Sequence, residues 1–520
     1  MKGAIQKIFS YNNLYLAFFL LLLVLVGFYS IITIPVGSDN GNVYFEVQHF
    51  KNNGFDRAYK TLTPVIPVVL YSILEEYNIP VLILSCISTI LFLISIYLLI
   101  KLFFGYKYPI FLIFLFPIIF ERSLYLAPYP LFMFLFTVSL YFFVKATQIK
   151  KETSVTVTHE YQEQEGHNEF SRQKFYILSA LFLSLSIYTF TLALILCVVP
   201  FFYLIFTKLD RNSKFRIFIK YYFCLFLFLF PWLYWHFKIG GLKYFYYSPL
   251  NWYTIKALPL VNKYFWGYGS IAYSDLLRLY SNQLIPNILL SICLIFIVFG
   301  LLNYKKFKIP IKFSILWIIF YLPFVAIFGA SSFSRYFFPL VVPLMLISSA
   351  GLIALKKYNK KALYFALSLI LIYSILYINT SYFSSWRIEN FFQPSTSLLD
   401  FKGFKELINN DKNIFSRHHA FQYLFNNNFF ITQSDMAEED ALKLISWSSD
   451  SDVKEILKKY NIGWIILYND EKKWEHDYYC WVSILYDKEP IHYKRVKNSN
   501  LFEEIKHGKQ YSLYKFVDSE

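Results

Sequence analysis

Long apolar runs, separated by short basic connections, fill the first 380 residues of the chain. An α-helix needs about 20 apolar residues to cross the hydrocarbon core of a bilayer. By this criterion we predict about eleven membrane-spanning helices, at 12–34, 80–100, 108–125, 128–145, 175–190, 191–207, 217–237, 285–303, 312–330, 337–355 and 362–380. A transmembrane β-barrel is not expected, because its strands alternate polar and apolar residues in short segments.

The composition agrees with this pattern. Of the 520 residues, 57% are hydrophobic, 22% aromatic and only 16% charged, whereas soluble chains carry about 25% charged residues. This excludes an ordinary cytosolic enzyme, a disordered chain and a collagen-like fibre. The five cysteines include no pair whose spacing suggests a disulfide or a metal site.

The charge distribution predicts the orientation of the helices. Lys and Arg number 50 against 34 Asp and Glu, a net charge of +16, which in a soluble protein would suggest nucleic acid as a partner. Here the basic residues gather in alternate connections, at 2–7, 101–107, 145–174, 208–220, 305–312 and 356–361. Basic connections stay in the cytoplasm, so we expect a cytoplasmic N-terminus, an extracytoplasmic C-terminus and no nucleic-acid partner. We predict a multi-pass protein of a bacterial inner (cell) membrane.

Two long loops and the C-terminal region therefore face outward in this prediction. The loops span 35–79 and 238–284, whereas the polar cytoplasmic stretch 151–171 is interpreted as a flexible linker. The domain boundary falls near 380: residues 1–380 form the transmembrane domain, and residues 381–520 form a small extracytoplasmic α/β domain.

The C-terminal region alternates short apolar runs with one amphipathic stretch. The predicted elements are strands at Asn413–Ser416, Ile462–Tyr468 and Tyr511–Val517, and helices at His418–Phe425 and Ser451–Tyr460. No glycine-rich phosphate-binding motif accompanies them, so we expect no nucleotide cofactor.

The first outer loop holds the main catalytic candidate. Asp39 follows the first apolar helix, and a carboxylate at the membrane surface can act as a general base on a hydroxyl group. Tyr44 and Glu46 follow on a predicted short helix, and Lys60 supplies a cation. The alternative is that Asp39 only caps a helix or is a solvated loop residue.

Two further outer positions carry charge. Arg335, followed by Tyr336, comes just before the predicted helix 337–355, where its donors would add to the positive helix end and suit a phosphate. The alternative is a snorkelling arginine beside an interfacial aromatic residue. Glu121 and Arg122 lie at another outer helix end, where they could also form a simple surface ion pair.

These features follow one another in an order that resembles a known family. The order is Asp39 before a Tyr-bearing helix, Pro64 and Pro67, the group Arg335, Tyr336, Pro339 and Pro343, and the outer α/β region. This arrangement resembles the GT-C membrane glycosyltransferases, in particular the protein mannosyltransferases and the aminoarabinose lipid A transferases of glycosyltransferase families 39 and 83.

The resemblance implies that the protein moves a sugar from a polyprenyl phosphate to an acceptor at the outer membrane face, with inversion. It implies that Asp39 is the general base and that Arg335, with Tyr336 nearby, faces the lipid phosphate. The acceptor is a glycan, a lipid or a protein, and membrane lipid is a further partner. We assign the other candidates to substrate binding: Tyr44, Glu46, Lys60, Glu121 and Arg122.

The sequence differs from the family pattern at two places. Asn40 follows Asp39 where an acidic residue is common, and Ala127–Tyr129 holds no carboxylate. We therefore assume no cofactor, with a divalent metal as an open alternative.

Two other functions stay open at this point. A transporter or flippase of a lipid-linked saccharide would place ionisable residues near the middle of its helices, and the predicted spans hold almost none. A non-catalytic membrane scaffold would tolerate loss of the Asp39 carboxylate.

Overall fold

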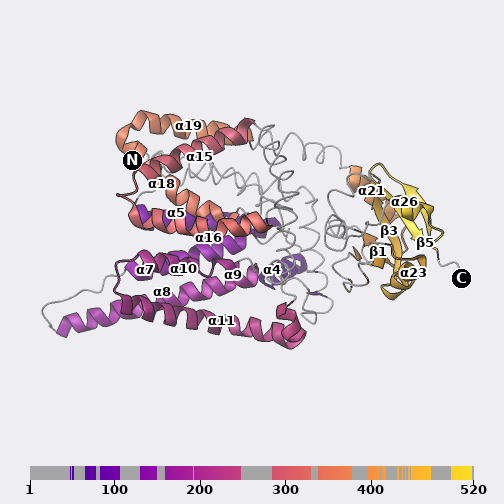
Figure 1. Cartoon of the computed structure of the whole chain (residues 1–520), viewed down its shortest axis with the longest axis horizontal. Helices are drawn as coiled ribbons and strands as arrows, with labels where there is room; N and C mark the ends of the chain where they lie inside the picture. The colour runs from indigo at the N-terminus through magenta and orange to yellow at the C-terminus, as the bar shows by residue number, and fades with distance from the viewer. Residues whose placement is uncertain are drawn as a thin grey trace. The chain divides into compact units, whose positions relative to one another are not determined.

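The computed structural model divides into two compact units, each described separately below (Figure 1). The helical unit comprises Met1–Ile32 and Phe55–Tyr382, and the sheet unit comprises Thr33–Gly54 and Phe383–Glu520. The structure describes residues 47, 50–51, 65–77, 82–105, 129–148, 159–190, 193–246, 284–328, 338–377, 396–409, 411–416, 425, 430–431, 436, 440, 443–444, 447–469 and 493–517.

The described part of the helical unit consists of helices and short turns that connect them. Its elements are α4 (Val65–Glu76), α5 (Leu82–Phe104), α7 (Tyr129–Gln148), α8 (His159–Thr189), α9 (Ala193–Leu196), α10 (Val199–Phe206), α11 (Arg211–Tyr246), α15 (Leu284–Leu302), α16 (Lys308–Phe328), η5 (Phe338–Leu340), α18 (Val341–Tyr358) and α19 (Lys360–Tyr377). They match nine of the eleven predicted segments, and the predicted helices 12–34 and 108–125 lie outside the described residues.

Four described helices are long and apolar enough to span a membrane. They are Ile83–Phe104, Tyr129–Gln148, Arg211–Trp235 and Phe338–Tyr358. The class predicted from the sequence, a helical membrane protein, is therefore supported, and the total of eleven spans remains a prediction.

Three helix boundaries correct the sequence prediction. The predicted helix 191–207 is broken into α9 and α10, because Pro200 in the first turn of α10 cannot donate the hydrogen bond that would continue α9. Part of the predicted linker, from His159 onward, is the beginning of α8, since glutamate and glutamine favour helix. Helix α11 continues to Tyr246, so helix occupies the first residues of the predicted loop 238–284.

Small residues bring the helices of this unit together. Ser139 Oγ on α7 donates to the carbonyl oxygen of Ser179 on α8 at 2.7 Å, and Ser179 Oγ returns a bond to the Ser139 carbonyl at 2.8 Å. On α18, a Cβ added to Gly351 would lie 1.9 Å from the carbonyl oxygen of Phe296 on α15. Such close backbone contacts are how helices associate in lipid, where burial of apolar surface gives little driving force.

The sheet unit contains one mixed sheet of five strands. The strands are β1 (Asn413–Ser416), β2 (Phe430–Ile431), β3 (Ile462–Tyr468), β4 (Phe502–His507) and β5 (Tyr511–Phe516), in the spatial order β2-β1-β3-β5-β4. The three strands β2, β1 and β3 are parallel, and β5 is antiparallel to both of its neighbours.

Helices cover both faces of this sheet, because alternate strand residues point to opposite sides. Ile414 and Ile466 pack with the side chains of α21 (Thr396–Lys405) on one face. Phe415, Ile465 and Leu467 pack with α23 (Asp450–Lys459) and α26 (Tyr493–Asn498) on the other.

The predicted elements of this region are largely confirmed. Strands β1 and β3 have the predicted bounds, β5 ends one residue early, and α23 is shifted by one residue. The helix predicted at His418–Phe425 lies outside the described residues except for Phe425. The domain boundary near 380 and the extracytoplasmic placement remain predictions.

Candidate functional site

The predicted site residues lie outside the described part of the chain. They are Asp39, Tyr44, Glu46, Lys60, Glu121, Arg122, Arg335 and Tyr336. Their roles therefore remain predictions, but three described elements begin shortly after them in the sequence: α4 after Lys60, α7 after Arg122 and η5 after Tyr336.

The first two of these elements, α4 and α7, both pack against α8. We call the end of the helical unit where α4 lies the α4 end (Figure 1). The hydroxyl oxygen of Tyr71 on α4 lies 3.3 Å from Ser85 Oγ in the first turn of α5. The ring of Tyr129, the first residue of α7, lies 5.2 Å from that of Phe190 at the end of α8. The first turn of α7 thus lies beside the end of α8, the helix that α4 also contacts.

The third element, η5, is anchored inside the unit. The Phe338 ring is fully buried and lies 5.4 Å from the ring of Phe92, ten residues after α5 begins. At 1.5 Å per residue, Phe92 lies about 15 Å along α5 from its first residue. The sequence predicted a helix from 337, but the structure begins with a 3₁₀ turn and only then α18, with Pro339 and Pro343 fixing two backbone φ angles.

Cations collect at the opposite end, which we call the basic end. Lys145 Nζ near the end of α7 lies 4.6 Å from the ring centroid of Phe175 on α8. Lys312 Nζ on α16 lies 5.8 Å from the centroid of Phe206, the last residue of α10. The ring of Phe104 at the end of α5 lies 5.4 Å from that of Phe307, next to α16. Basic connections far apart in the sequence therefore lie at one end, as predicted.

Between the two ends, several described helices carry no charged residue. This holds for residues 82–100 of α5, 129–144 of α7, 284–302 in α15 and 341–355 of α18. No group of three metal-ligating side chains occurs among the described residues. The charge of the described helical unit is thus confined mostly to the helix ends.

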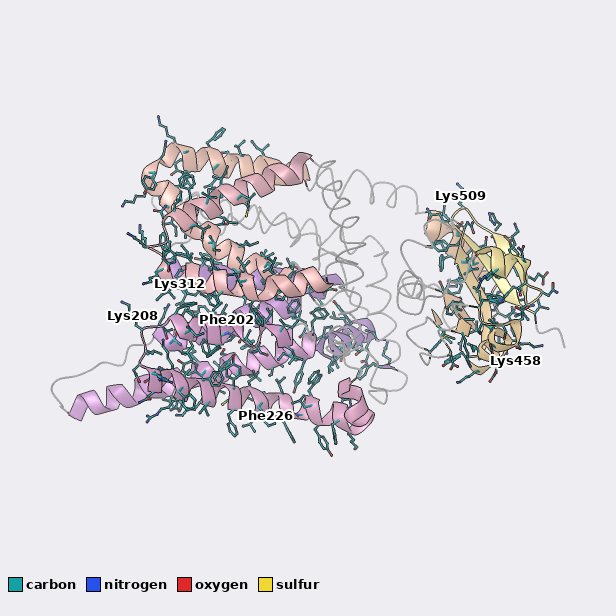
Figure 2. All side chains as sticks on the ribbon, viewed as in Figure 1. Phe202, Lys208, Phe226, Lys312, Lys458 and Lys509 are labelled. Carbon is teal, nitrogen blue, oxygen red and sulfur yellow. The ribbon has the colours of Figure 1, made fainter. Side chains whose placement is uncertain are left out.

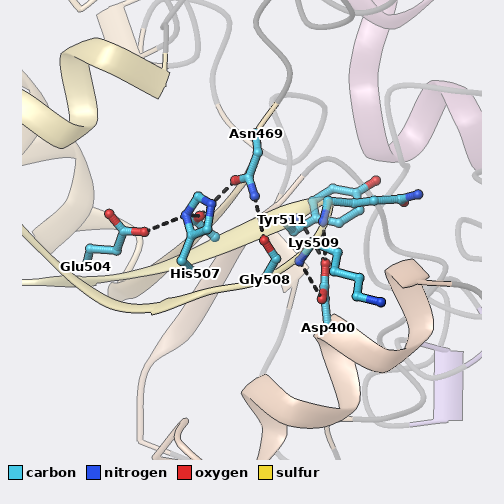
Figure 3. Close-up of polar contacts among 9 residues, drawn as sticks. Asp400, Asn469, Glu504, His507, Gly508, Lys509 and Tyr511 are labelled. Atoms are coloured by element: carbon cyan, nitrogen blue, oxygen red, sulfur yellow. Dashed lines mark hydrogen bonds and ion pairs between the residues drawn. The ribbon is translucent and has the colours of Figure 1, made fainter.

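A polar cluster in the sheet unit could be mistaken for a catalytic site (Figure 3). His507 Nδ1 lies 2.8 Å from Ser512 Oγ and 2.9 Å from Glu504 Oε1. A nucleophile triad needs the serine and the acid on different ring nitrogens, but here both meet Nδ1. Ser512 Oγ also donates to Asn469 Oδ1 at 2.8 Å, so the hydroxyl group is held within the fold.

The same cluster fixes the turn between β4 and β5. The Asp400 carboxylate on α21 accepts backbone N–H bonds from Lys509, Gln510 and Tyr511 at 3.0, 2.7 and 3.1 Å. A Cβ at Gly508 would lie 2.5 Å from Asp400 Cγ, so the turn needs glycine there. No sequence motif marks Asp400, because its three partners lie more than 100 residues later in the chain. We assign a structural role to this cluster.

Comparison with solved structures identifies proteins of similar fold. No protein-family model matches the chain, and no curated protein matches it. Two solved structures resemble it along most of its length, although the sequence identities of 10% and 12% are low. The likeness therefore concerns the fold alone.

The first is ArnT from Cupriavidus metallidurans bound to undecaprenyl phosphate, with a TM-score of 0.57 and coverage of 97% of this chain and 98% of that one. The second is the oligosaccharyltransferase AglB from Archaeoglobus fulgidus in complex with an inhibitory peptide and a dolichol-phosphate, with a TM-score of 0.52 and coverage of 88% and 70%. Both have the GT-C fold, so the resemblance inferred from the sequence is confirmed at the level of fold.

Proposed function

We propose that this protein is a membrane glycosyltransferase that transfers a sugar from a polyprenyl phosphate to an acceptor at the outer membrane face. The observation that carries this proposal is the GT-C fold along nearly the whole chain. ArnT and AglB are glycosyltransferases, and their structures hold undecaprenyl phosphate and a dolichol-phosphate. The acceptor is a glycan, a lipid or a protein.

In the proposed reaction, Asp39 accepts the proton of the acceptor hydroxyl group as its oxygen bonds to the anomeric carbon of the sugar. The bond from that carbon to the phosphate oxygen breaks on the opposite face, so the configuration inverts. The electron pair goes to the phosphate, and a positively charged group stabilises the charge that develops there. We assign this role to Arg335, with Tyr336 beside it.

The arrangement of the helical unit supports a site away from the basic end. Elements α4 and α7 follow the first loop and the segment with Glu121 and Arg122, and both pack against α8. We place the outer membrane face there, the N-terminus in the cytoplasm and Glu520 outside. Tyr44, Glu46 and Lys60 complete the proposed acceptor side.

Transport of a lipid-linked saccharide is the competing function. It would place ionisable side chains along the middle of the spans, and the central parts of α5, α7 and α18 hold none. This observation favours a transfer reaction at the membrane surface over transport of a saccharide through the helical unit.

The test is sugar transfer from a polyprenyl-phosphate donor in nanodiscs, with donor binding measured separately. Asp39→Asn keeps the size of the side chain and removes its basicity, so we expect normal expression and donor binding but transfer reduced by roughly 10²-fold or more. Asp56→Asn in the same loop is the matched control and should retain activity. Wild-type transfer by Asp39→Asn would show that the base is misassigned.

The phosphate contact is tested separately. Arg335→Lys keeps the charge and loses the paired donors of the guanidinium group, so donor binding should weaken, and Arg335→Ala should weaken it further. Unchanged donor binding by both variants would mean that Arg335 does not contact the phosphate.

A further inference from the structure

The basic end of the helical unit carries a surface that the proposed reaction does not use. It is formed by the connections between α10 and α11 and between α15 and α16, together with the first residues of α11 and α16. We call it the basic collar, and it consists of Lys208, Arg211, Lys214, Lys305, Lys306, Lys308 and Lys312.

The last turn of α10 joins the two halves of the collar. Lys214 Nζ donates to the carbonyl oxygen of Ile205 at 2.8 Å. Lys312 Nζ lies 5.8 Å from the ring centroid of Phe206 and 5.9 Å from that of Tyr304. Figure 2 shows Lys208 and Lys312 at the same end of the helices. Residues about one hundred positions apart in the sequence therefore share one surface.

The collar is strongly positive. Residues 208–214 and 305–312 contain one acidic residue, Asp210. Its Oδ2 accepts a hydrogen bond from the Ser213 N–H at 2.8 Å and so caps the start of α11. In the described part of the chain, no carboxylate lies within ion-pair distance of Lys305, Lys308 or Lys312. The collar thus carries seven cations close to a single carboxylate.

Exposed apolar side chains adjoin these cations. Phe215, next to Lys214, is 63% exposed, and Leu302, three residues before Lys305, is 76% exposed. A ligand that covers both kinds of surface has an anionic head and apolar chains. Free phosphate would match only the cations.

We propose that the basic collar binds anionic phospholipids of the membrane leaflet at this end. Phosphate groups lie beside Lys308 and Lys312, with acyl chains along α15, and beside Lys214, with acyl chains along α11. Lys312 is half-buried between two aromatic rings, so its ammonium group is held in place before the lipid arrives. The collar lies at the end opposite the proposed reaction site and does not depend on that proposal.

The first experiment measures thermal unfolding of the full chain in neutral detergent after addition of phosphatidylglycerol, phosphatidylcholine or inorganic phosphate. We expect phosphatidylglycerol to raise Tm by several degrees and the other two to have little effect. The double variant Lys308→Gln/Lys312→Gln should lose most of this increase. The control pair Lys402→Gln/Lys405→Gln on α21 should keep it, as should Lys308→Arg/Lys312→Arg.

Equal increases with phosphatidylcholine, an increase with inorganic phosphate alone, or a full increase in the Gln pair would each overturn the proposal. A second measurement does not depend on the stability of the variants. Native mass spectrometry of the wild-type protein from nanodiscs with equal amounts of the two lipids should show retained phosphatidylglycerol in excess. Equal retention of both lipids would also overturn the proposal.

Discussion

The helical unit and the sheet unit differ in what their surfaces present to the surroundings. The helical unit, residues 1–32 and 55–382, holds 31 Lys and Arg against 11 Asp and Glu, whereas the sheet unit, residues 33–54 and 383–520, holds 19 against 23. On helix α11, the side chains of Phe223, Phe226 and Phe230 are 52–60% exposed. In the described sheet unit, the exposed large apolar side chains are Leu399, Leu407 and Val517. The first surface suits lipid and anionic headgroups, and the second suits water.

The interiors of the two units differ in the same way. Helices in lipid gain little from burying apolar surface, so glycine and serine contacts hold α15 against α18 and α7 against α8. The sheet unit has apolar cores on both faces, and a carboxylate on α21 fixes its last turn. Point substitutions should therefore affect the two units through different contacts.

The largest effect is expected at the contact between α15 and α18. Gly351→Ala would place a Cβ 1.9 Å from the backbone oxygen of Phe296, which no rotamer change relieves. We expect loss of the monodisperse species in detergent, because overpacking of this kind costs about 1–3 kcal/mol or more. Gly105→Ala is the control: its added Cβ meets no atom within 4 Å, although φ is +70°. Size-exclusion chromatography distinguishes the two, and a normal profile for Gly351→Ala would contradict the packing described.

The next largest effect is expected in the sheet unit. Asp400→Ala would leave three backbone N–H groups without their acceptor, at a cost of about 2–4 kcal/mol. Proteolysis should then cleave near Lys509 while the helical unit stays intact. Asp411→Ala on the exposed surface is the control. Equal protease resistance of both variants would show that the turn does not depend on Asp400.

A smaller effect is expected between α7 and α8. Ser179→Ala removes the bond from the Ser179 hydroxyl group to the Ser139 carbonyl oxygen and keeps the bond that Ser139 donates to the Ser179 backbone carbonyl. Interhelical bonds of this kind contribute about 0.6–1.7 kcal/mol in membrane proteins. We expect a fall in Tm of a few degrees. Ser184→Ala is the control, because its hydroxyl group bonds only to the Leu181 carbonyl within its own helix. A larger fall for Ser184→Ala would contradict the assignment.

The smallest effect concerns pH and the sheet unit. The Lys459 ammonium, 2.8 Å away, together with the Tyr460 hydroxyl, lowers the pKa of Asp440 below its ordinary value of 3.8. A lowered pKa in the folded state gives stability above the unfolded-state pKa, and this stability is lost as pH falls through the folded-state pKa. Asp440→Asn should therefore lower the stability of the sheet unit at pH 7 slightly and flatten its loss below about pH 4. Parallel acid unfolding curves for both proteins would rule out this contribution.

Secondary-structure elements are easier to predict from this sequence than contacts between distant segments. Continuous apolar runs and the strand Ile462–Tyr468 depend on local periodicity, and the helices and β3 appear where this periodicity predicts them. The apolar run 191–207 predicts one continuous helix because hydropathy does not register the hydrogen bond that Pro200 cannot donate. The bonds of Asp400 to the turn after His507 could not be predicted, since they join segments far apart in the chain. The roles of Asp39 and Arg335 still depend on the family resemblance and on the proposed reaction.

The most direct test of the proposed function is the position of a polyprenyl phosphate bound to this protein. We suggest cryo-electron microscopy of the full chain in nanodiscs with undecaprenyl phosphate added. The account predicts headgroup density towards the α4 end of the helical unit, whether or not a lipid also occupies the basic collar. A headgroup bound only at the collar, or a protein that binds no polyprenyl phosphate, would contradict it.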